Sequence, residues 1–359
     1  MKRTNDDTPK SPRLPHNVQQ FLQQIVYNYS VRGVVNIYKL FVEEIVERYA
    51  SSNAEISLLI PSSILTDKTC EALRKRLLNT TSFSTIKIIA ENNHFIDAQQ
   101  ALCAILLKKG ITSKKITITN DYGGLTEETT VVPVKDMLLG NNEHMLLVLR
   151  PDEYKILHKL NSFPKIKDLD FIVNMRGELD LTTNSWAIKN EETPFPLLRG
   201  RHISFYRLSD VPIKEYVTSE FVCSVAKKQY IAGKRIICQQ ISNMAKERRL
   251  TFAPISENYV LGNSCNFITI KENEYDIDYS FMLGILNSSL MNWFFKLQSS
   301  NNHINNYEIG NFPMPVNYPF KEKLKELVNN YITDNTKQFL IAQIDVLVKE
   351  IFLTEQSKP

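Results

Sequence analysis

The sequence predicts an α/β fold with an incomplete sheet, followed by a mixed α+β domain and by helices at the C-terminus. Three observations predict it. Residues 36–109 show apolar patterns in the order helix, strand, helix, strand, strand. After Gly110, short alternating segments are separated by glycine and asparagine turns. Residues 321–353 carry apolar side chains at helical spacing, as amphipathic helices do.

The first third of the chain contains the clearest individual elements. Residues 1–16 are polar, include three prolines and are expected to be flexible. A helix is predicted from Asn36, and a buried strand over Ile56–Ile60 ends at Pro61. Thr66 and Asp67 are suited to begin the next helix, which runs to Leu78. Two strands should follow, at 86–90 and 102–107, so this region forms half of an α/β sheet with an antiparallel finish.

The rest of the chain is expected to contain strands, long loops and later helices. The predicted strands and helices are, in order, strands at 116–119 and 129–134, a helix at 151–160, strands at 235–239 and 266–270, a strongly apolar helix at 281–297, and amphipathic helices at 321–353.

Composition excludes several classes of protein. The chain has 359 residues, 43% hydrophobic and 23% charged, which is globular composition with room for two domains. No run approaches the roughly 18 apolar residues of a membrane-spanning helix, and the polar N-terminus is no secretory signal. The five cysteines form no CxxC pair, which argues against disulfides and structural zinc and favours a reducing, cytoplasmic location.

The net charge of +4 is unevenly distributed. Residues 221–250 hold seven basic residues and one acid, a net of +6. Just upstream, Arg199, Arg201 and His202 are followed by Phe205 and Tyr206. Basic residues among aromatic ones suit contact with nucleic acid, whereas a solvated helix face is the other interpretation.

Most catalytic signatures are missing from the sequence. It contains no GxGxxG, GxxxxGK[ST], GxSxG or HExxH motif. One carboxylate cluster, Asp168 with Glu178 and Asp180, lacks a suitably placed lysine for a metal-dependent nuclease. No catalytic, cofactor-binding or metal-binding residue is therefore predicted.

A family resemblance rests on three segments of the first third of the chain, Ile37–Glu43, Ile56–Leu65 and His94–Ala98. In this order they resemble the later half of TaqI-like N6-adenine DNA methyltransferases, with the strand Ile56–Ile60 ending in Pro61-Ser62-Ser63. The resemblance implies a partial Rossmann-like methyltransferase sheet and a pocket for a flipped adenine, formed by Phe95, Pro61 and Ser62. An aromatic face would replace the stacking that an extruded base loses. Phe95 as an ordinary core residue is the alternative.

The second half resembles the TaqI-like specificity domain. The matching segments are Pro196–Ile203, Leu283–Trp293 and Phe312–Pro315. On this basis we expect a flexible N-terminus (1–16), a partial methyltransferase domain (17–110), a target-recognition domain (111–319) and C-terminal helices (320–359).

Two motifs of that methyltransferase family are absent. The sequence has neither the methyl-donor loop Phe-x-Gly-x-Gly nor the catalytic Asn-Pro-Pro-Tyr, and we expect it to begin just downstream of them. This chain should therefore bind no cofactor and be inactive alone. S-adenosylmethionine is expected on a partner chain.

Two leading hypotheses follow. The chain is the recognition half of a split site-specific N6-adenine methyltransferase of a restriction-modification system, with double-stranded DNA and a catalytic subunit as partners and no membrane. Alternatively, it is a non-catalytic specificity protein for a restriction endonuclease or other defence complex. An inactive remnant is the third hypothesis.

We expect the cations to divide between two tasks. Arg201 should read a base edge, because arginine binds guanine through two hydrogen bonds, while the 221–250 cations should contact phosphates. The asparagine-rich segment 301–307 could read adenine or form turns. The predicted DNA-binding residues are Arg199, Arg201, His202, Lys227, Lys228, Lys234, Arg235, Arg248, Arg249, Asn302, His303 and Asn305.

Overall fold

The computed structural model describes residues 17–18, 20, 27–32, 35–89, 101–120, 126–138, 144–244, 246–299, 302–318 and 320–354. The chain divides into two compact units, Met1–Lys155 (unit 1) and Ile156–Pro359 (unit 2). Helix α6 (Pro151–Asn161) contains the division between them. The α/β fold class is confirmed. No helix among the described residues is long and apolar enough to cross a membrane.

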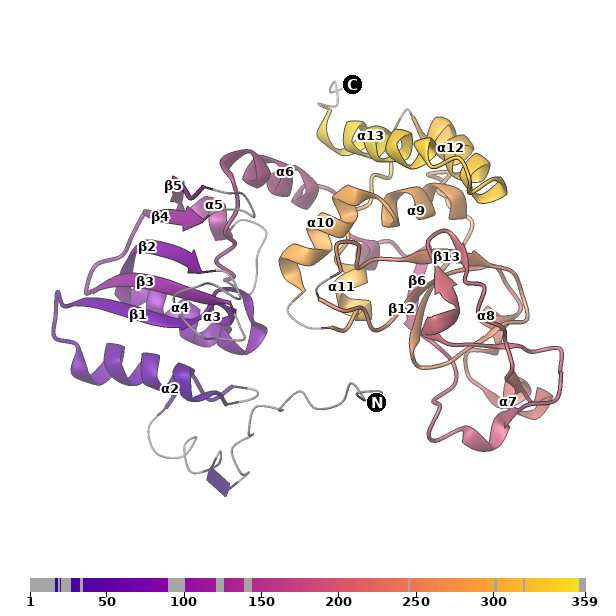
Figure 1. The fold of residues 1–359 in the computed structure, drawn as a ribbon, viewed down its shortest axis with the longest axis horizontal. Coiled ribbons are helices and arrows are strands. Elements are labelled where there is room, and N and C mark those ends of the chain that lie inside the picture. The colour runs from indigo at the N-terminus through magenta and orange to yellow at the C-terminus, as the bar shows by residue number, and fades with distance from the viewer. Residues whose placement is uncertain are drawn as a thin grey trace, which may run out of the picture. The chain divides into compact units, whose positions relative to one another are not determined.

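Unit 1 is built on a five-stranded sheet with the order β1-β3-β2-β4-β5 (Figure 1). Only the β2–β4 pair is parallel. The strands are β1 (Glu55–Pro61), β2 (Thr81–Ile89), β3 (Leu102–Lys109), β4 (Lys115–Asn120) and β5 (Glu128–Pro133). The helices are α2 (Ile37–Glu44), which continues as a π-helical turn (Ile45–Tyr49), α3 (Ser63–Thr66), α4 (Glu71–Thr80) and α5 (Val134–Leu138).

The predicted elements of unit 1 are found, and local chemistry explains their bounds. Alternation buries Ile56, Leu58 and Ile60 on one face of β1. The Asp67 side chain accepts a hydrogen bond from the amide of Thr69 at 2.7 Å and begins the turn that leads into α4. The first unit was expected to end at residue 110, whereas unit 1 runs to Lys155. It extends further because β4 pairs with β2 and continues the same sheet.

The two faces of this sheet differ in exposure. Strand register places Leu58, Ile105, Ile86 and Ile118 in one cross-strand row, and all four are buried. The other face carries exposed apolar side chains. They are Leu59, Leu106 and Val131.

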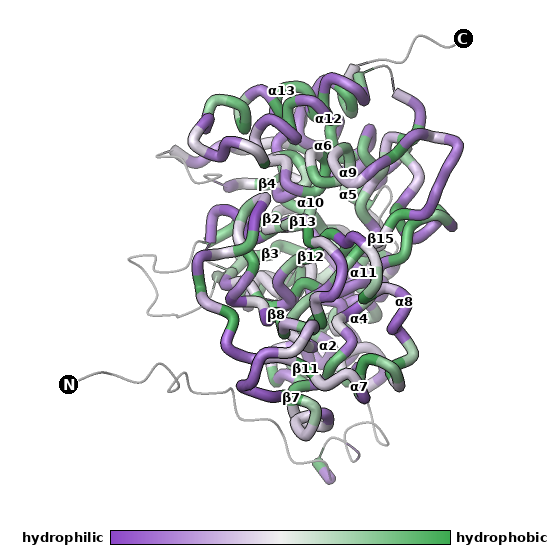
Figure 2. The backbone as a smooth tube through the Cα atoms, turned by 90° about the vertical axis from the view of Figure 1, so that its right-hand side faces the viewer, coloured by the Kyte–Doolittle hydropathy of each residue, from purple (hydrophilic) through white to green (hydrophobic). Residues whose placement is uncertain are grey.

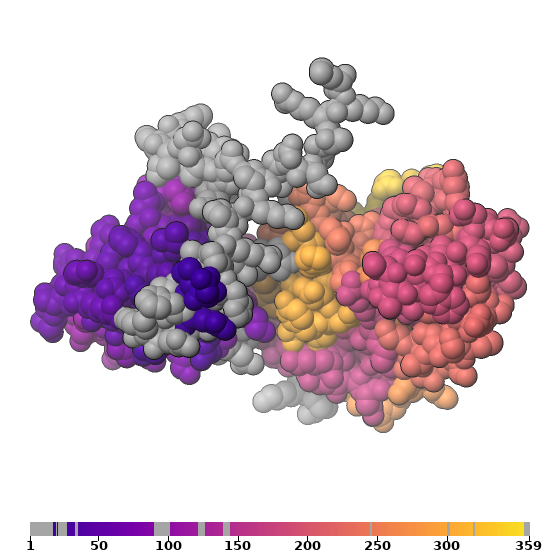
Figure 3. Space-filling model, turned by 90° about the horizontal axis from the view of Figure 1, so that it is seen from below, coloured from indigo at the N-terminus to yellow at the C-terminus, as the bar shows by residue number. Residues whose placement is uncertain are grey.

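Unit 2 contains a four-stranded sheet of order β13-β12-β15-β6 and three two-stranded ones. The main strands are β6 (Ile172–Arg176), β12 (Arg235–Gln239), β13 (Phe252–Ile255) and β15 (Cys265–Ile270). The short strands are β7 (Ile188–Lys189), β8 (Leu197–Leu198), β9 (Ile203–Ser204), β10 (Arg207–Leu208), β11 (Tyr216–Val217) and β14 (Val260–Leu261). Segments far apart in sequence lie against one another in this unit (Figure 3), as where Asn174 and Asn306 exchange hydrogen bonds of 2.7 and 2.8 Å.

The helices of unit 2 lie mainly toward the C-terminus. They are α7 (Ser219–Ser224), α8 (Lys228–Ile231), α9 (Tyr279–Leu286), α10 (Ser289–Gln298), α11 (Asn306–Gly310), α12 (Lys321–Thr333) and α13 (Phe339–Leu353). The single helix predicted at 281–297 is two helices, because Ser288 caps α10 by accepting from the Met291 amide. Helices α12 and α13 are amphipathic as predicted, with apolar and polar residues alternating along both (Figure 2).

Candidate nucleic-acid interface

One end of the β12–β15–β6 sheet gathers polar side chains from distant segments. Strands β12 and β6 are both antiparallel to β15, so their C-terminal ends lie together where β15 begins. The register pairs Gln239 with Cys265 and Arg176 with Asn266. Gln239 and Arg176 therefore lie at the same end of the sheet.

A shallow hollow of about 330 Å³ opens at this end, lined by Leu181, Arg199, Gly200, Arg201, Gln239, Ile241 and Ser264. Glu215 forms ion pairs with two arginines there. One oxygen, Oε1, pairs with Arg199, and the other, Oε2, lies 3.4 Å from Nη2 of Arg201. The Arg201 side chain is 53% exposed, against 27% for Arg199. Of the two arginines predicted to bind DNA, Arg201 is therefore the one available at the surface.

Beside the hollow, Arg176 is exposed and held by two hydrogen bonds. Its Nε donates to the carbonyl of Asn263 at 2.7 Å, and Nη2 donates to Oε1 of Gln240 at 3.0 Å. The sequence pattern predicts neither Arg176 nor Gln240 as a site residue. Their proximity depends on strand order, which the sequence pattern alone does not give.

The loop after β12 runs alongside the segment 302–303. Ile241 and His303 form an isolated antiparallel β-bridge. The backbone amide of Met244 donates a hydrogen bond to Oδ1 of Asn302 at 3.0 Å. Ile241 and Met244 are exposed, at 57% and 44%. We call the set Arg176, Arg201, Gln239, Gln240, Ile241, Met244, Asn302 and His303 the sheet-end surface.

Two of the predicted DNA-binding cations are buried instead. Arg235 is fully buried, where it forms an ion pair with Glu178 and donates to the carbonyl of Tyr259. Arg249 is 2% exposed, with its guanidinium carbon 4.8 Å from the Phe295 ring centre. The burial of Arg235 follows from the sheet, because β12 is covered on both faces and its first residue cannot reach solvent.

His202 is also buried, which corrects the prediction that it contacts DNA. Its Nδ1 accepts a hydrogen bond from the amide of Arg199 at 3.0 Å and so closes the turn Gly200–His202. Burial, with Arg201 nearby, lowers the pKa of the imidazole below 6.5. A neutral His202 therefore supports the loop that presents Arg201.

The remaining predicted cations have different surroundings. Lys227 donates to the carbonyls of Arg176 and Gly177, at 2.7 and 3.3 Å. Arg248 donates to the carbonyl of Asn287 at 2.5 Å, its guanidinium carbon 4.5 Å from the Phe205 ring centre. Lys228 is exposed on α8.

Lys234 is exposed but precedes β12, about 16 Å from Gln239 at roughly 3.3 Å per strand residue. It lies away from the sheet-end surface.

Asn305 caps a helix in unit 2. Its side chain donates to Oε2 of Glu308 at 2.9 Å, and its backbone amide donates to the same oxygen at 2.7 Å. Within the asparagine-rich segment, therefore, Asn305 begins α11, while Asn302 and His303 are exposed on the sheet-end surface.

The predicted base pocket belongs to unit 1. Pro61 ends β1, and the amide of Ser62 donates to the carbonyl of Ala101 at 3.0 Å. Both residues are half-buried. Phe95 lies outside the described residues.

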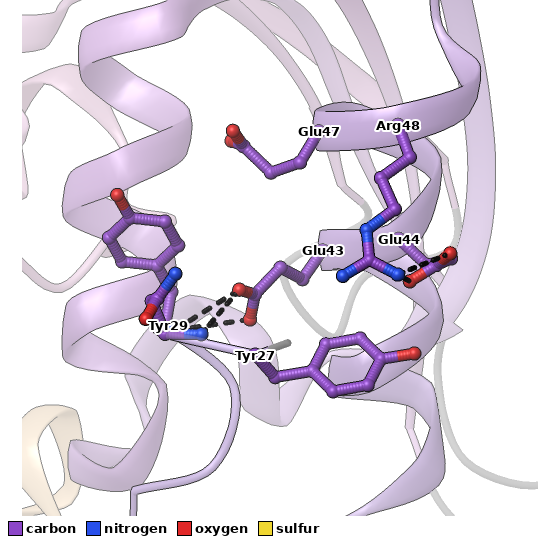
Figure 4. Close-up of a pocket in the computed structure, with 7 residues that line it drawn as sticks. Tyr27, Tyr29, Glu43, Glu44, Glu47 and Arg48 are labelled. Atoms are coloured by element: carbon purple, nitrogen blue, oxygen red, sulfur yellow. Dashed lines mark hydrogen bonds and ion pairs between the residues drawn. The ribbon is translucent and has the colours of Figure 1, made fainter. Parts of the chain in front are cut away.

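A second hollow in unit 1, of about 110 Å³, surrounds Glu43 (Figure 4). The Glu43 carboxylate accepts hydrogen bonds from the backbone amides of Asn28, Tyr29 and Ser30, at 2.7, 3.1 and 2.8 Å. The hydroxyl of Ser30 also donates to it, at 2.6 Å. This carboxylate ties the segment before α2 to that helix.

Among the described residues, no group of three or more His, Cys, Asp or Glu side chains could hold a metal ion.

Comparison with known proteins places a family model on unit 2. Residues 195–314 match the TaqI-like C-terminal specificity domain, which confirms the resemblance of the second half of the chain. No curated protein matches the sequence.

Among solved structures, the Type IIL restriction-modification enzyme MmeI in complex with DNA matches with a TM-score of 0.50 and 10% identity. The match covers 90% of this chain and 50% of that one. The type IIG restriction endonuclease BpuSI gives 0.39 and 11%, covering 94% and 51%. The ATP-dependent Type ISP enzyme LlaBIII bound to DNA gives 0.44 and 10%, covering 90% and 28%. This chain thus spans about half the length of MmeI, and that likeness concerns the fold.

Proposed function

We propose that this chain, whose residues 195–314 match a TaqI-like specificity domain, recognises double-stranded DNA in a restriction-modification system. The observation that carries the proposal is that every residue of the sheet-end surface except Arg176 lies inside that domain. Arg201, Gln239, Gln240, Ile241, Met244, Asn302 and His303 all fall within the matched range. Arginine, amide and apolar groups side by side are the chemistry that reads base edges in the major groove.

We further propose that the chain is the recognition half of a split N6-adenine methyltransferase. Its sequence contains neither a Gly-x-Gly donor loop nor Asn-Pro-Pro-Tyr, so its residues do not fit S-adenosylmethionine, and a partner would bind the cofactor. Unit 1 would complete the base pocket through Pro61, Ser62 and Phe95.

The outer edge of the sheet supports a partner. β1 is the terminal strand of the sheet, and among the described residues no strand pairs with its outer side. Helix α2 contacts β1, and an edge strand without a paired neighbour can still pair with a strand of another chain. Exposed Leu59 and Leu106 on the neighbouring face add apolar surface for the catalytic subunit to cover.

The decisive experiment combines DNA binding with methyl transfer. The chain is purified alone and with a candidate subunit whose sequence contains the donor loop and Asn-Pro-Pro-Tyr. Gel shift on a mixed DNA pool should show sequence-selective binding, and labelled S-adenosylmethionine should methylate adenine only when both chains are present. Selective binding without methylation in the mixture would favour the endonuclease-specificity alternative. Absence of DNA binding in every mixture would refute both functions.

Two variants localise the roles of the units. Arg201→Ala should relax sequence preference, because it removes a base-reading guanidinium. Equal loss on target and random DNA would contradict that role. Phe95→Ala should lower methylation by the complex while binding persists, since base–aromatic stacking contributes about 1–3 kcal/mol. Unchanged methylation would mean that Phe95 does not contact the base.

A further inference from the structure

We infer that Arg176, which lies outside the matched specificity segment, is a specificity-determining residue that binds a guanine in the target site. The inference rests on the proposed DNA-recognition function. It goes beyond that function by naming a base and a residue that neither the sequence motifs nor the family match indicates.

The Arg176 backbone is fixed before any ligand binds. It is the last residue of β6, and its carbonyl accepts a hydrogen bond from Lys227 Nζ at 2.7 Å. The next amide, of Gly177, donates to the carbonyl of Cys265 at 2.9 Å. Gly177 is required there, because a Cβ atom would lie 2.3 Å from the carbonyl oxygen of Gly262. This backbone is therefore positioned by β-sheet contacts.

The Arg176 side chain is also oriented in advance. Nε–H donates to the carbonyl of Asn263, and one hydrogen of Nη2 donates to Gln240, so two of the five guanidinium hydrogens are used. Nη1 takes part in neither bond, so both of its hydrogens and the second hydrogen of Nη2 remain as donors. Holding a long side chain in place reduces the entropy lost on binding.

The charge of Arg176 is not neutralised by a neighbouring acid. Arg207 and Arg199 form ion pairs with Asp210 and Glu215, whereas no carboxylate in the described part of the chain pairs with exposed Arg176. Guanine O6 and N7 form the acceptor pair that matches two parallel donors on the terminal edge of arginine. The side-chain oxygen of Gln240 accepts from Arg176, so its amide nitrogen remains a donor next to the proposed guanine.

The test selects binding sites from random double-stranded DNA with the full chain, in complex with its subunit where binding requires it. Wild type, Arg176→Ala, Arg176→Lys and the control Arg207→Ala are compared, each checked for an unchanged thermal transition. Arg176→Ala should lose the requirement for guanine at one position and bind the wild-type site about 5- to 150-fold more weakly, which corresponds to 1–3 kcal/mol. Arg176→Lys should fail to restore that guanine, because lysine is a point charge. Arg207→Ala should select the wild-type motif.

Three other outcomes would refute the inference. An unchanged motif with uniformly weaker binding in Arg176→Ala, restored by Arg176→Lys, would identify a phosphate contact. An unchanged motif with unchanged affinity would place Arg176 outside the interface. If wild type selects no motif, the proposed function itself fails.

Discussion

Replacing Arg235 tests the assignment of buried and exposed cations in unit 2. Its guanidinium bonds Glu178 and the Tyr259 carbonyl, with both side chains of the ion pair fully buried, and the guanidinium carbon lies 5.4 Å from the Phe267 ring centre. Glu178 also accepts the amide of Leu261 at 2.7 Å. Arg235→Met keeps the apolar stem but leaves a carboxylate buried without its cation.

The expected loss is large because the remaining charge cannot be solvated. Removing one partner of a buried ion pair costs about 3–5 kcal/mol. For a unit of this size, each kcal/mol lowers the transition temperature by about 2–4 °C, so the shift should be about 6–20 °C. Adding Glu178→Gln should recover part of the loss, since the amide is neutral and still accepts from Leu261.

The pH dependence supplies a second measure of the same effect. Burial raises the pKa of Glu178, and Arg235 opposes that rise. Without Arg235 the folded-state pKa rises further above the unfolded value of 4.5. A raised carboxyl pKa contributes stability that is present below 4.5 and lost as pH rises through the folded-state value. The unfolding free energy of Arg235→Met should therefore be closest to that of wild type at acid pH.

Urea and thermal unfolding of the full chain, at pH 5 and pH 8, measure these differences. A cost below about 1 kcal/mol for Arg235→Met at pH 8 would refute the burial argument. So would a double variant whose loss equals the sum of the two single losses, because coupled partners are not additive.

Three further predictions concern the sheet-end surface and its support. Exposed Lys246 follows Met244 of the sheet-end surface by two residues, so Lys246→Ala should weaken binding to all sequences and lower the salt slope by about 0.9, the contribution of one phosphate contact. Lys234→Ala should leave both unchanged, and identical effects of the two variants in salt titrations would contradict the assigned surface. Gly177→Ala should cost about 1–3 kcal/mol or more in unfolding assays, because its Cβ would overlap the backbone of Gly262, and a neutral result would disprove the close approach. His202→Asn should flatten the loss of stability as pH falls below 6.5, because a lowered imidazole pKa makes the unfolded state bind the proton first. An unchanged pH dependence of the unfolding free energy would contradict the lowered pKa.

Local pattern was sufficient for many elements. Alternation of Ile56, Leu58 and Ile60 predicted β1, and the aspartate at Asp67 predicted the start of the helical segment that follows. These features depend on neighbours within a few residues, which the sequence displays directly. The specificity-domain motifs were recognisable for the same reason, being short segments in a fixed order.

The class of fold, most elements of unit 1 and the strongly basic stretch could be predicted from the sequence. Strands β6 and β13 were not predicted, and which of the cations face solvent depends on tertiary packing. Adjacent Lys234 and Arg235 look alike in sequence, yet one is exposed and the other is enclosed with Glu178. Arg176, remote from the basic stretch, joins Gln240 through strand order. The formal charge of a residue follows from its chemistry, whereas its solvation depends on what packs over it.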